Sequence, residues 1–135
     1  MVVDMRSFLD RLKLRCGATI AAIAEGEEQL VARLPAEYIE FLKLGNGGEG
    51  FIGNGYVILW GVEELASMNR SYEVQKYAPG LLIFGSDGGG EAYGFDTRCP
   101  QWPIVQVPFV GMDWRYARSM GDLFSDFLRS LHEAV

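Results

Sequence analysis

The sequence predicts an α+β fold in which a mainly antiparallel β-sheet is flanked by N-terminal, middle and C-terminal helices. Apolar residues recur at helical spacing near both ends of the chain, and short apolar runs typical of strands cluster in the middle, separated by glycine-rich turns. The 135 residues are 49% hydrophobic and 22% charged, which suits one globular domain spanning residues 1–135. A chain of this length buries about two thirds of its surface on folding. We therefore expect a fold that needs neither a disulfide nor a metal for its stability.

Three helices are predicted in the first part of the chain. Asp4 can cap a short helix that ends at Cys16, and residues 18–33 carry apolar side chains at helical spacing. The clearest helix is LPAEYIEFLKLG, residues 34–45, in which the tyrosine, phenylalanine and second leucine share one face. Its last glycine, Gly45, can supply the left-handed residue just past the helix end.

The rest of the chain is predicted to hold four strands and two more helices. Residues 45–55 are rich in glycine and contain two Asn-Gly pairs, which indicate turns. A helix over residues 62–73 keeps one apolar face for the sheet. The runs YVILW, LLIF, EAYGFD and PIVQV are typical of strands and occupy residues 56–60, 81–84, 91–96 and 103–107.

The chain closes with a predicted helix that has a capping-box-like start. Ser119 and Asp122 have the spacing of such a cap. An apolar stripe follows at helical spacing, formed by Leu123, Phe124, Phe127, Leu128 and Leu131.

FGSDGGGEAYGFD, residues 84–96, places three consecutive glycines between acidic residues. A Walker-type phosphate loop needs a lysine and a hydroxyl after its last glycine, where this chain has Glu91 and Ala92. Asp87, Glu91 and Asp96 offer carboxylates to a divalent cation, but strand alternation would place Glu91 and Asp96 on opposite faces. We interpret the segment as a turn between strands, in which Asp87 accepts hydrogen bonds from the backbone and the acidic corner can contact a partner.

No catalytic centre is defined by the sequence. GNGGEG, residues 45–50, fits the G-x-G-x-x-G pattern, but it follows a predicted helix and leads into a strand, the reverse of a dinucleotide-binding motif. The one histidine, His132, falls in the last turn of the closing helix, where it suits the helix C-terminus better than it suits a Cys-His pair. We predict no enzymatic activity, no metal and no cofactor. A hydrolase built on carboxylates is the less favoured alternative.

The net charge of -6 comes from 18 acidic and 12 basic side chains. At long range it would repel a nucleic-acid backbone and attract a basic protein, although solubility alone equally accounts for it. No run approaches the roughly 20 apolar residues of a membrane span, and charges in the first 16 residues exclude the apolar core of a signal peptide. We expect a cytoplasmic protein whose Cys16 and Cys99 are reduced thiols, with a protein partner and no direct contact with nucleic acid or membrane.

Aromatic residues and arginines are concentrated in CPQWPIVQVPFVGMDWRYAR. These residue types dominate the hot spots of protein interfaces. Trp102 and Phe109 are expected to fill core space at the sheet edge. Trp114, Arg115 and Tyr116 fall in a predicted loop, where core packing and partner contact are equally expected.

The order of these segments resembles the SMI1/KNR4 family, also called the SUKH superfamily. The resemblance rests on LPAEYIEFLKLGNGG, GVEELASMNRSYEV, LLIFGSDGGGEAYGFDTR, PIVQV and SMGDLFSDFLRSL, and covers roughly residues 30–131. It implies an α+β fold without catalytic machinery. Bacterial members are mostly immunity proteins that neutralise polymorphic toxins, many of them nucleases, whereas fungal relatives regulate cell-wall synthesis. GEGFIGNG departs from the family in lacking a longer polar insert.

The resulting hypothesis is an immunity-type module that binds a basic toxin domain, with acidic side chains competing for the toxin's nucleic-acid site. The alternative is an intracellular regulatory or scaffold domain that binds host proteins. Charge reversal at Glu49 and Asp87 is expected to slow association most. The predicted contact residues are Glu49, Asp87, Glu91, Asp113, Trp114 and Arg115.

Overall fold

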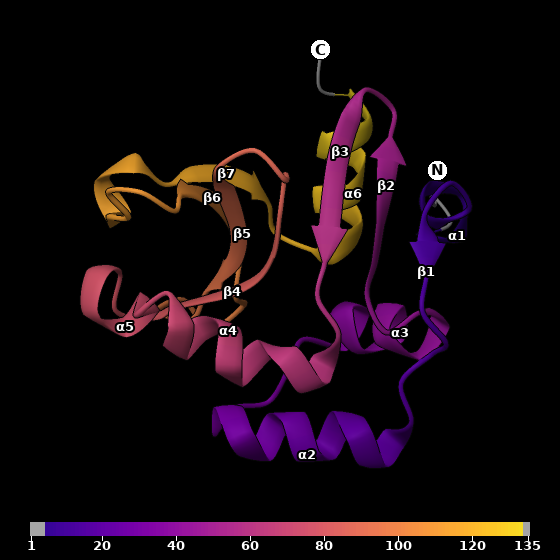
Figure 1. Cartoon of the computed structure of the whole chain (residues 1–135), viewed down its shortest axis with the longest axis horizontal. Helices are drawn as coiled ribbons and strands as arrows, with labels where there is room; N and C mark the ends of the chain where they lie inside the picture. The colour runs from indigo at the N-terminus through magenta and orange to yellow at the C-terminus, as the bar shows by residue number, and fades with distance from the viewer. Residues whose placement is uncertain (1–4, 134–135) are drawn as a thin grey trace.

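The structure, a computed structural model, describes residues 5–133 and confirms the α+β fold (Figure 1). Within that range seven strands form one sheet, in which every strand pairs antiparallel with the next one along the chain. The strands are β1 Lys13–Leu14, β2 Gly48–Ile52, β3 Gly55–Leu59, β4 Leu81–Ser86, β5 Glu91–Asp96, β6 Ile104–Pro108 and β7 Arg118–Gly121.

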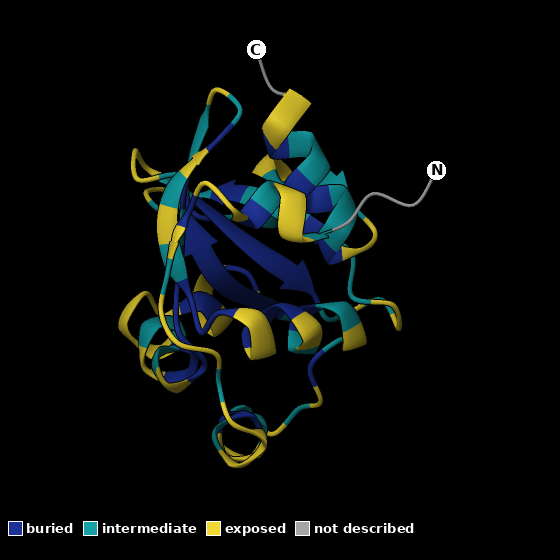
Figure 2. Cartoon of the chain, turned by 90° about the vertical axis from the view of Figure 1, so that its right-hand side faces the viewer, coloured by how far each residue is buried: buried dark blue, intermediate teal, exposed yellow. Residues whose placement is uncertain are grey.

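Helices cover the sheet on both sides. The α-helices are α1 Met5–Leu9, α2 Ile20–Leu30, α3 Ala36–Leu44, α4 Leu65–Ser71, α5 Val74–Tyr77 and α6 Phe124–Glu133, and the 3-10 helices are η1 Val62–Glu64 and η2 Trp114–Tyr116. α6 packs against β2, β3 and β7, whereas α4 and α5 pack against β4. α2 packs against η1 and α4 (Figures 1 and 2).

The sheet is nearly divided between β3 and β4. These strands pair only at Ile58–Ser86 and Leu59–Gly85, so the first half of β4 has no neighbouring strand on that side. Asn69 takes the place of one: its side-chain amide donates to the Ile83 carbonyl at 2.9 Å and accepts from the Ile83 N–H at 2.9 Å. The backbone groups of Ile83, which no neighbouring strand pairs on that side, are thereby satisfied by a side chain from α4.

The core is built around aromatic rings from two helices, α3 and α6, and from the two central strands β4 and β5. Every residue of β4 is buried, and Phe84 lies 4.7 Å from Phe95 between ring centroids. The hydroxyl of Tyr38 has no hydrogen-bond partner among the described residues, and burial raises its pKa far above the ordinary value. The largest fully buried rings are Tyr38, Phe41, Phe84, Phe95, Phe124 and Phe127.

The structure corrects the prediction for the beginning of the chain. The first helix ends at Leu9, and Lys13–Leu14 form a strand instead of continuing the helix to Cys16. The proposed Asp4 cap lies outside the described residues. Gly45 is also not left-handed, because its φ of -160° is extended.

The glycine-rich segment expected to be only turns contains β2. Its glycines are required there by the close approach of β1: a Cβ on Gly48 would lie 2.2 Å from the Lys13 carbonyl oxygen. The sequence G-E-G therefore belongs to a strand that accepts a neighbour, which a turn prediction based on glycine content overlooks.

The start of the last helix is also corrected. Residues 118–121 form β7 and pair with β6, so Ser119 and Asp122 do not cap the helix. Instead, Asp126 accepts a hydrogen bond from the Leu123 N–H at 3.1 Å. Leu123 is 51% exposed and does not belong to the apolar stripe, whose other predicted members are all buried.

Candidate protein-binding surface

The predicted contact residues lie in three separate parts of the molecule. Glu49 is on β2, Asp87 and Glu91 flank the β4–β5 turn, and the others belong to the β6–β7 loop at the opposite end of the sheet from β2 (Figure 1). The last group consists of Asp113, Trp114 and Arg115.

The β4–β5 segment is a glycine turn between two strands, as interpreted from the sequence. One carboxylate oxygen of Asp87 accepts the backbone N–H groups of residues 89–91 at 2.7, 3.1 and 3.0 Å. Gly88 and Gly90 have φ angles of 79° and 134°, which glycine adopts without strain. Asp87 therefore organises the turn, and much of its hydrogen-bonding capacity is used within it.

Glu91 and Asp87 also affect a buried neighbour. Glu91 accepts a hydrogen bond from the Gln106 side chain at 3.1 Å. Burial, followed by the charges of Asp87 and Glu91, raises the pKa of Tyr93 to about 12. The acidic corner is thus tied to β5 and β6 rather than free to reorient toward a partner.

Glu49 lies in a hollow of about 620 Å³ on the outer face of β1–β3. It accepts the hydroxyl hydrogen bond of Tyr56, which raises the pKa of that tyrosine. Among the described residues, Glu49 is the only acidic side chain lining this hollow, and its charged neighbours are the cations Arg11, Lys13 and Arg15. The surroundings of Glu49 are therefore basic, a distribution that the overall charge does not reveal.

The β6–β7 loop is ordered by Asp113, which caps η2. Its carboxylate accepts the Arg115 N–H at 2.9 Å and pairs with the Arg115 guanidinium at 3.2 Å. The backbone hydrogen bond from Arg115, and then its side chain, lower the pKa of Asp113. The cap leaves the Arg115 side chain 70% exposed.

Trp114 is held in place by two segments far away in the sequence. Its indole N–H donates to the Pro79 carbonyl at 2.8 Å, and the Arg98 guanidinium lies 3.5 Å from the ring centroid. The ring is half-buried, so it is fixed but still presents apolar surface. A tryptophan restrained in this way loses little side-chain entropy when a partner binds.

Arg98 is positioned in turn by the buried carboxylate of Asp96. Two parallel hydrogen bonds join them, from Nε at 2.9 Å and from Nη2 at 3.1 Å, and the Arg98 backbone N–H adds a third at 3.0 Å. The side-chain bonds from Arg98 are the main cause of the lowered pKa of Asp96. Asp96, weighed as a metal ligand in the sequence, thus orients the arginine that stacks on Trp114.

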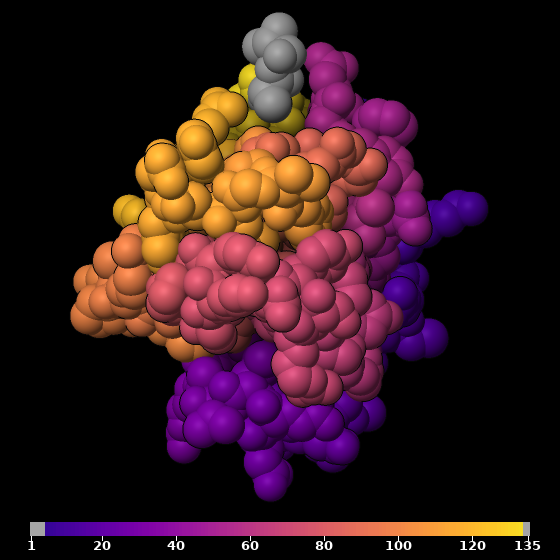
Figure 3. All heavy atoms as spheres, turned by 60° about the vertical axis from the view of Figure 1, so that its left-hand side comes forward, coloured from indigo at the N-terminus to yellow at the C-terminus, as the bar shows by residue number. Residues whose placement is uncertain are grey.

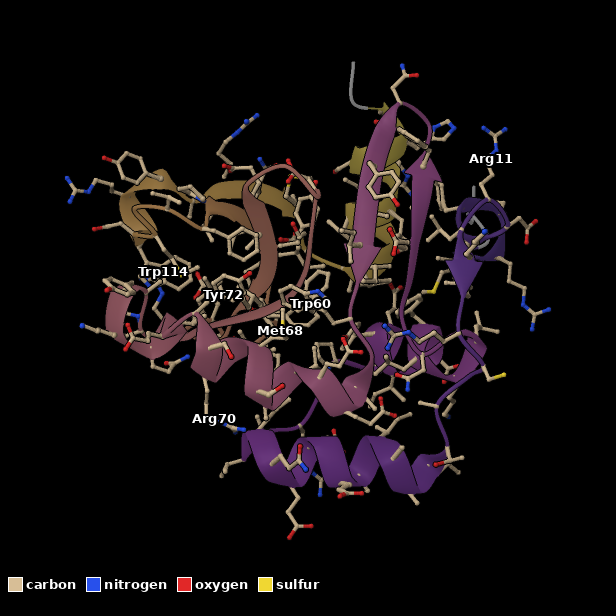
Figure 4. The ribbon with its side chains drawn as sticks, viewed as in Figure 1. Arg11, Trp60, Met68, Arg70, Tyr72 and Trp114 are labelled. Carbon is tan, nitrogen blue, oxygen red and sulfur yellow. The ribbon has the colours of Figure 1, made fainter. Side chains whose placement is uncertain are left out.

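These groups adjoin further aromatic residues from the C-terminal cap of α4 and from the β6–β7 loop. The Tyr72 and Phe109 rings lie 4.5 Å apart between centroids, and Figure 4 shows Trp60, Met68, Tyr72 and Trp114 in a row on the inner side of α4 and α5. Phe109 and Trp102 are half-buried against the core, as expected. We call the surface formed by Tyr72, Arg98, Phe109, Trp114 and Arg115 the η2 surface.

Sequence reasoning identified Trp114 and Arg115 but missed the roles of Arg98 and Pro79. The short spacing of Asp96 and Arg98 is a local signal for an ion pair across a turn, and it was available in the sequence. The contact of Pro79 with Trp114 spans 35 positions and has no local signature.

Other chemistry of the described residues is limited. Cys16 and Cys99 are free thiols. Between residues 5 and 133, no group of three or more histidine, cysteine, aspartate or glutamate side chains is arranged to hold a metal ion. Nor does any helix in this range have the length and apolar character needed to cross a membrane.

The family model described as SMI1 / KNR4 family (SUKH-1) matches residues 17–130. The chain belongs to the SMI1/KNR4 family. The match runs from the loop before α2 into α6 and includes both the glycine turn and η2. No curated protein matches the chain. Membership in the SMI1/KNR4 family confirms the resemblance seen in the motifs and fits an immunity-type module.

Proposed function

We propose that this SMI1/KNR4 protein is a non-catalytic binding module that neutralises a toxin by covering part of its surface. The observation that carries the proposal is the η2 surface, where Trp114 is fixed by Pro79 and Arg98 while its ring remains partly exposed. Tryptophan, tyrosine and arginine contribute most of the energy in protein interfaces. Family membership supports a protein, rather than a small molecule, as the partner.

The charge distribution supports a basic toxin domain, such as a nuclease, as that partner. Carboxylates are concentrated on α2, α3 and η1, and the side-chain carboxylates of Glu25 and Glu28 have no ion-pair or hydrogen-bond partner among the described residues. Such charges raise the rate of encounter with a basic protein, whereas fixed aromatic groups slow its dissociation. Free thiols at Cys16 and Cys99 suit the cytosol, where we place the protein.

The structure changes which residues test electrostatic steering. Asp87 holds three backbone amides, so reversing its charge would disturb the turn together with the surface potential. Glu49 lies among cations. Glu25→Lys and Glu28→Lys on α2 change the charge without breaking a contact that the structure contains.

The function is tested by capture from a lysate of the source strain, at low and moderate salt, with mass spectrometry of the retained proteins. We expect one basic polypeptide, retained less at higher salt and lost with Trp114→Ala. Coexpression with that polypeptide should then restore growth if it is toxic. Retention of ordinary cellular proteins only, with no basic polypeptide, would contradict the immunity function and favour a regulatory or scaffold domain.

A further inference from the structure

A second hollow lies between the end of α2 and the helices α4 and α5, and its lining does not include the residues of the η2 surface. Its volume is about 530 Å³, and it is lined by the end of α2, by α4 and α5, by β4 and by the β5–β6 loop. Figure 3 shows α4 and α5 (rose) between α2 (purple) below and the β6–β7 loop (orange) above. Leu30, Val74, Leu82 and Trp102 give the hollow an apolar lining. We call it the α2–α5 hollow.

Unusual backbone conformations are concentrated in this hollow. Among the described residues, only Val31, Glu73 and Trp102 combine a side chain with a positive φ, at 54°, 51° and 53°. All three line the α2–α5 hollow. Left-handed conformations cost energy for residues that carry a Cβ, and such strain is concentrated at binding sites.

Val31 shows the strain most clearly. It occupies the position after α2 where helices commonly place glycine, and the Ala32 N–H closes the motif by donating to the Glu27 carbonyl at 3.1 Å. Branching at Cβ makes a left-handed valine especially unfavourable. Val31 is also 89% exposed, so packing within the chain does not compensate. Burial against a partner would supply the missing compensation.

Two cations border the same hollow. Arg70 extends from α4 toward the C-terminal end of α2 (Figure 4), and Lys76 lies on α5. Neither forms an ion pair with a carboxylate among the described residues, and the Lys76 ammonium group lies 5.3 Å from the centroid of the Tyr77 ring. Within the part of the chain that the structure describes, Glu73 is the single acidic residue of the lining. A ligand carrying a carboxylate therefore complements the charge of this hollow.

We infer that the α2–α5 hollow receives an apolar side chain adjacent to a carboxylate, presented by an exposed segment of the protein partner. This inference rests on the proposed function and names the chemistry of one part of the interface. The apolar group covers Val31 and enters beside Trp102, while the carboxylate meets Arg70 and Lys76. The acidic helices and this hollow then recognise different parts of one partner.

The inference is tested without the partner, using two blocked tetrapeptides, Gly-Phe-Asp-Gly and Gly-Phe-Lys-Gly. Each is titrated into the full ¹⁵N-labelled chain and followed by amide chemical shifts. We expect shifts confined to the lining of the hollow, with the aspartate peptide binding at least about fivefold more tightly than the lysine peptide. Absence of shifts in the lining, or equal binding of the two peptides, would overturn the inference.

Charge reversal provides the sharper arm of this experiment. In the Arg70→Glu/Lys76→Glu variant the preference should invert, so that the lysine peptide binds more tightly. A preference that stays unchanged would show that these cations do not recognise the carboxylate. Because this result does not depend on any lysate, it can fail while a toxin is still captured, and the proposed function would then survive.

The contribution of Val31 is separated from its strain by a matched pair of variants. Val31→Gly should raise the melting temperature by about 3 °C, because glycine adopts this conformation freely. The same variant should bind the aspartate peptide about threefold more weakly, because apolar contact is lost. Val110→Gly removes another valine, 93% exposed and with no positive φ, and should do neither. Unchanged peptide binding by Val31→Gly would contradict the role of Val31 in the hollow.

Discussion

The glycine turn between β4 and β5 and the β6–β7 loop with η2 both carry acidic residues that the sequence marks as contacts, but they use them differently. In the turn, Asp87 holds three backbone amides of its own segment. In the loop, Asp113 caps η2, and Trp114 is fixed by Pro79 and Arg98 from elsewhere in the chain. A conspicuous charged motif can therefore stabilise a turn, whereas the proposed binding surface depends on residues brought together by the fold.

The largest expected effect is on the turn. Asp87→Ala removes the acceptor of three backbone hydrogen bonds and should lower the free energy of unfolding by about 2 kcal/mol. Asp87→Asn keeps a side-chain oxygen, so its free energy of unfolding should fall clearly less than that of Asp87→Ala. Urea denaturation followed by circular dichroism measures both. If both variants lose a negligible free energy of unfolding, Asp87 does not organise the turn, and the contrast between the turn and the β6–β7 loop is wrong.

The next effect is on binding at the η2 surface. Trp114→Ala should weaken binding of the captured partner by about 2 kcal/mol, roughly 30-fold in affinity, because a restrained aromatic side chain is lost. Trp114→Phe keeps an aromatic ring but loses the hydrogen bond to Pro79. Its affinity for the partner should lie between the affinities of the wild type and of Trp114→Ala. Calorimetric titration gives the affinities. If Trp114→Ala lowers stability but leaves the affinity unchanged, the tryptophan belongs to the fold alone.

A smaller effect concerns pH and the carboxylate behind Arg98. The pKa of Asp96 is lowered from its ordinary value of 3.8, so its ionised form stabilises the folded protein above that pH. This contribution is lost as the pH falls through the folded-state pKa. The melting temperature of Asp96→Asn should therefore lie a few degrees, roughly, below that of the wild type at pH 7 and approach it near pH 3.

Asp113→Asn is the control for that experiment, because Asp113 also has a lowered pKa but is more exposed. Its melting temperature should follow the wild type closely at every pH. A gap between Asp96→Asn and the wild type that persists unchanged at pH 3 would mean that packing, and not the charge of Asp96, holds Arg98.

The smallest effect is expected from Arg115, whose side chain is 70% exposed. Exposed ion pairs contribute little to stability, so Arg115→Ala should change the free energy of unfolding by less than about 0.5 kcal/mol. The free energy of binding to the partner should change by more than the free energy of unfolding. If the free energy of unfolding changes more than the free energy of binding, a role for Arg115 in partner binding is contradicted.

Local sequence signals predicted several parts of both regions correctly. The Asp-Gly-Gly-Gly run predicted the turn and the role of Asp87, because an aspartate binds backbone amides a few residues away. The concentration of aromatics and arginine singled out Trp114 and Arg115, and their contact with a partner stays a prediction. The strands β1, β2 and β7 were missed, because β1 and β7 are too short to show periodicity and the glycines of β2 are typical of turns.

By itself, the sequence determined the fold class, the family, the helices α2, α3 and α6 and the central strands β3 to β6, because apolar periodicity and turn residues act within a few positions. Only the tertiary structure decided that Arg98 stacks on Trp114, that Glu49 lies among cations, and that Val31, Glu73 and Trp102 meet in one hollow. Those arrangements depend on chain segments that become neighbours when the core closes, and the distances between them are set by packing rather than by position along the chain.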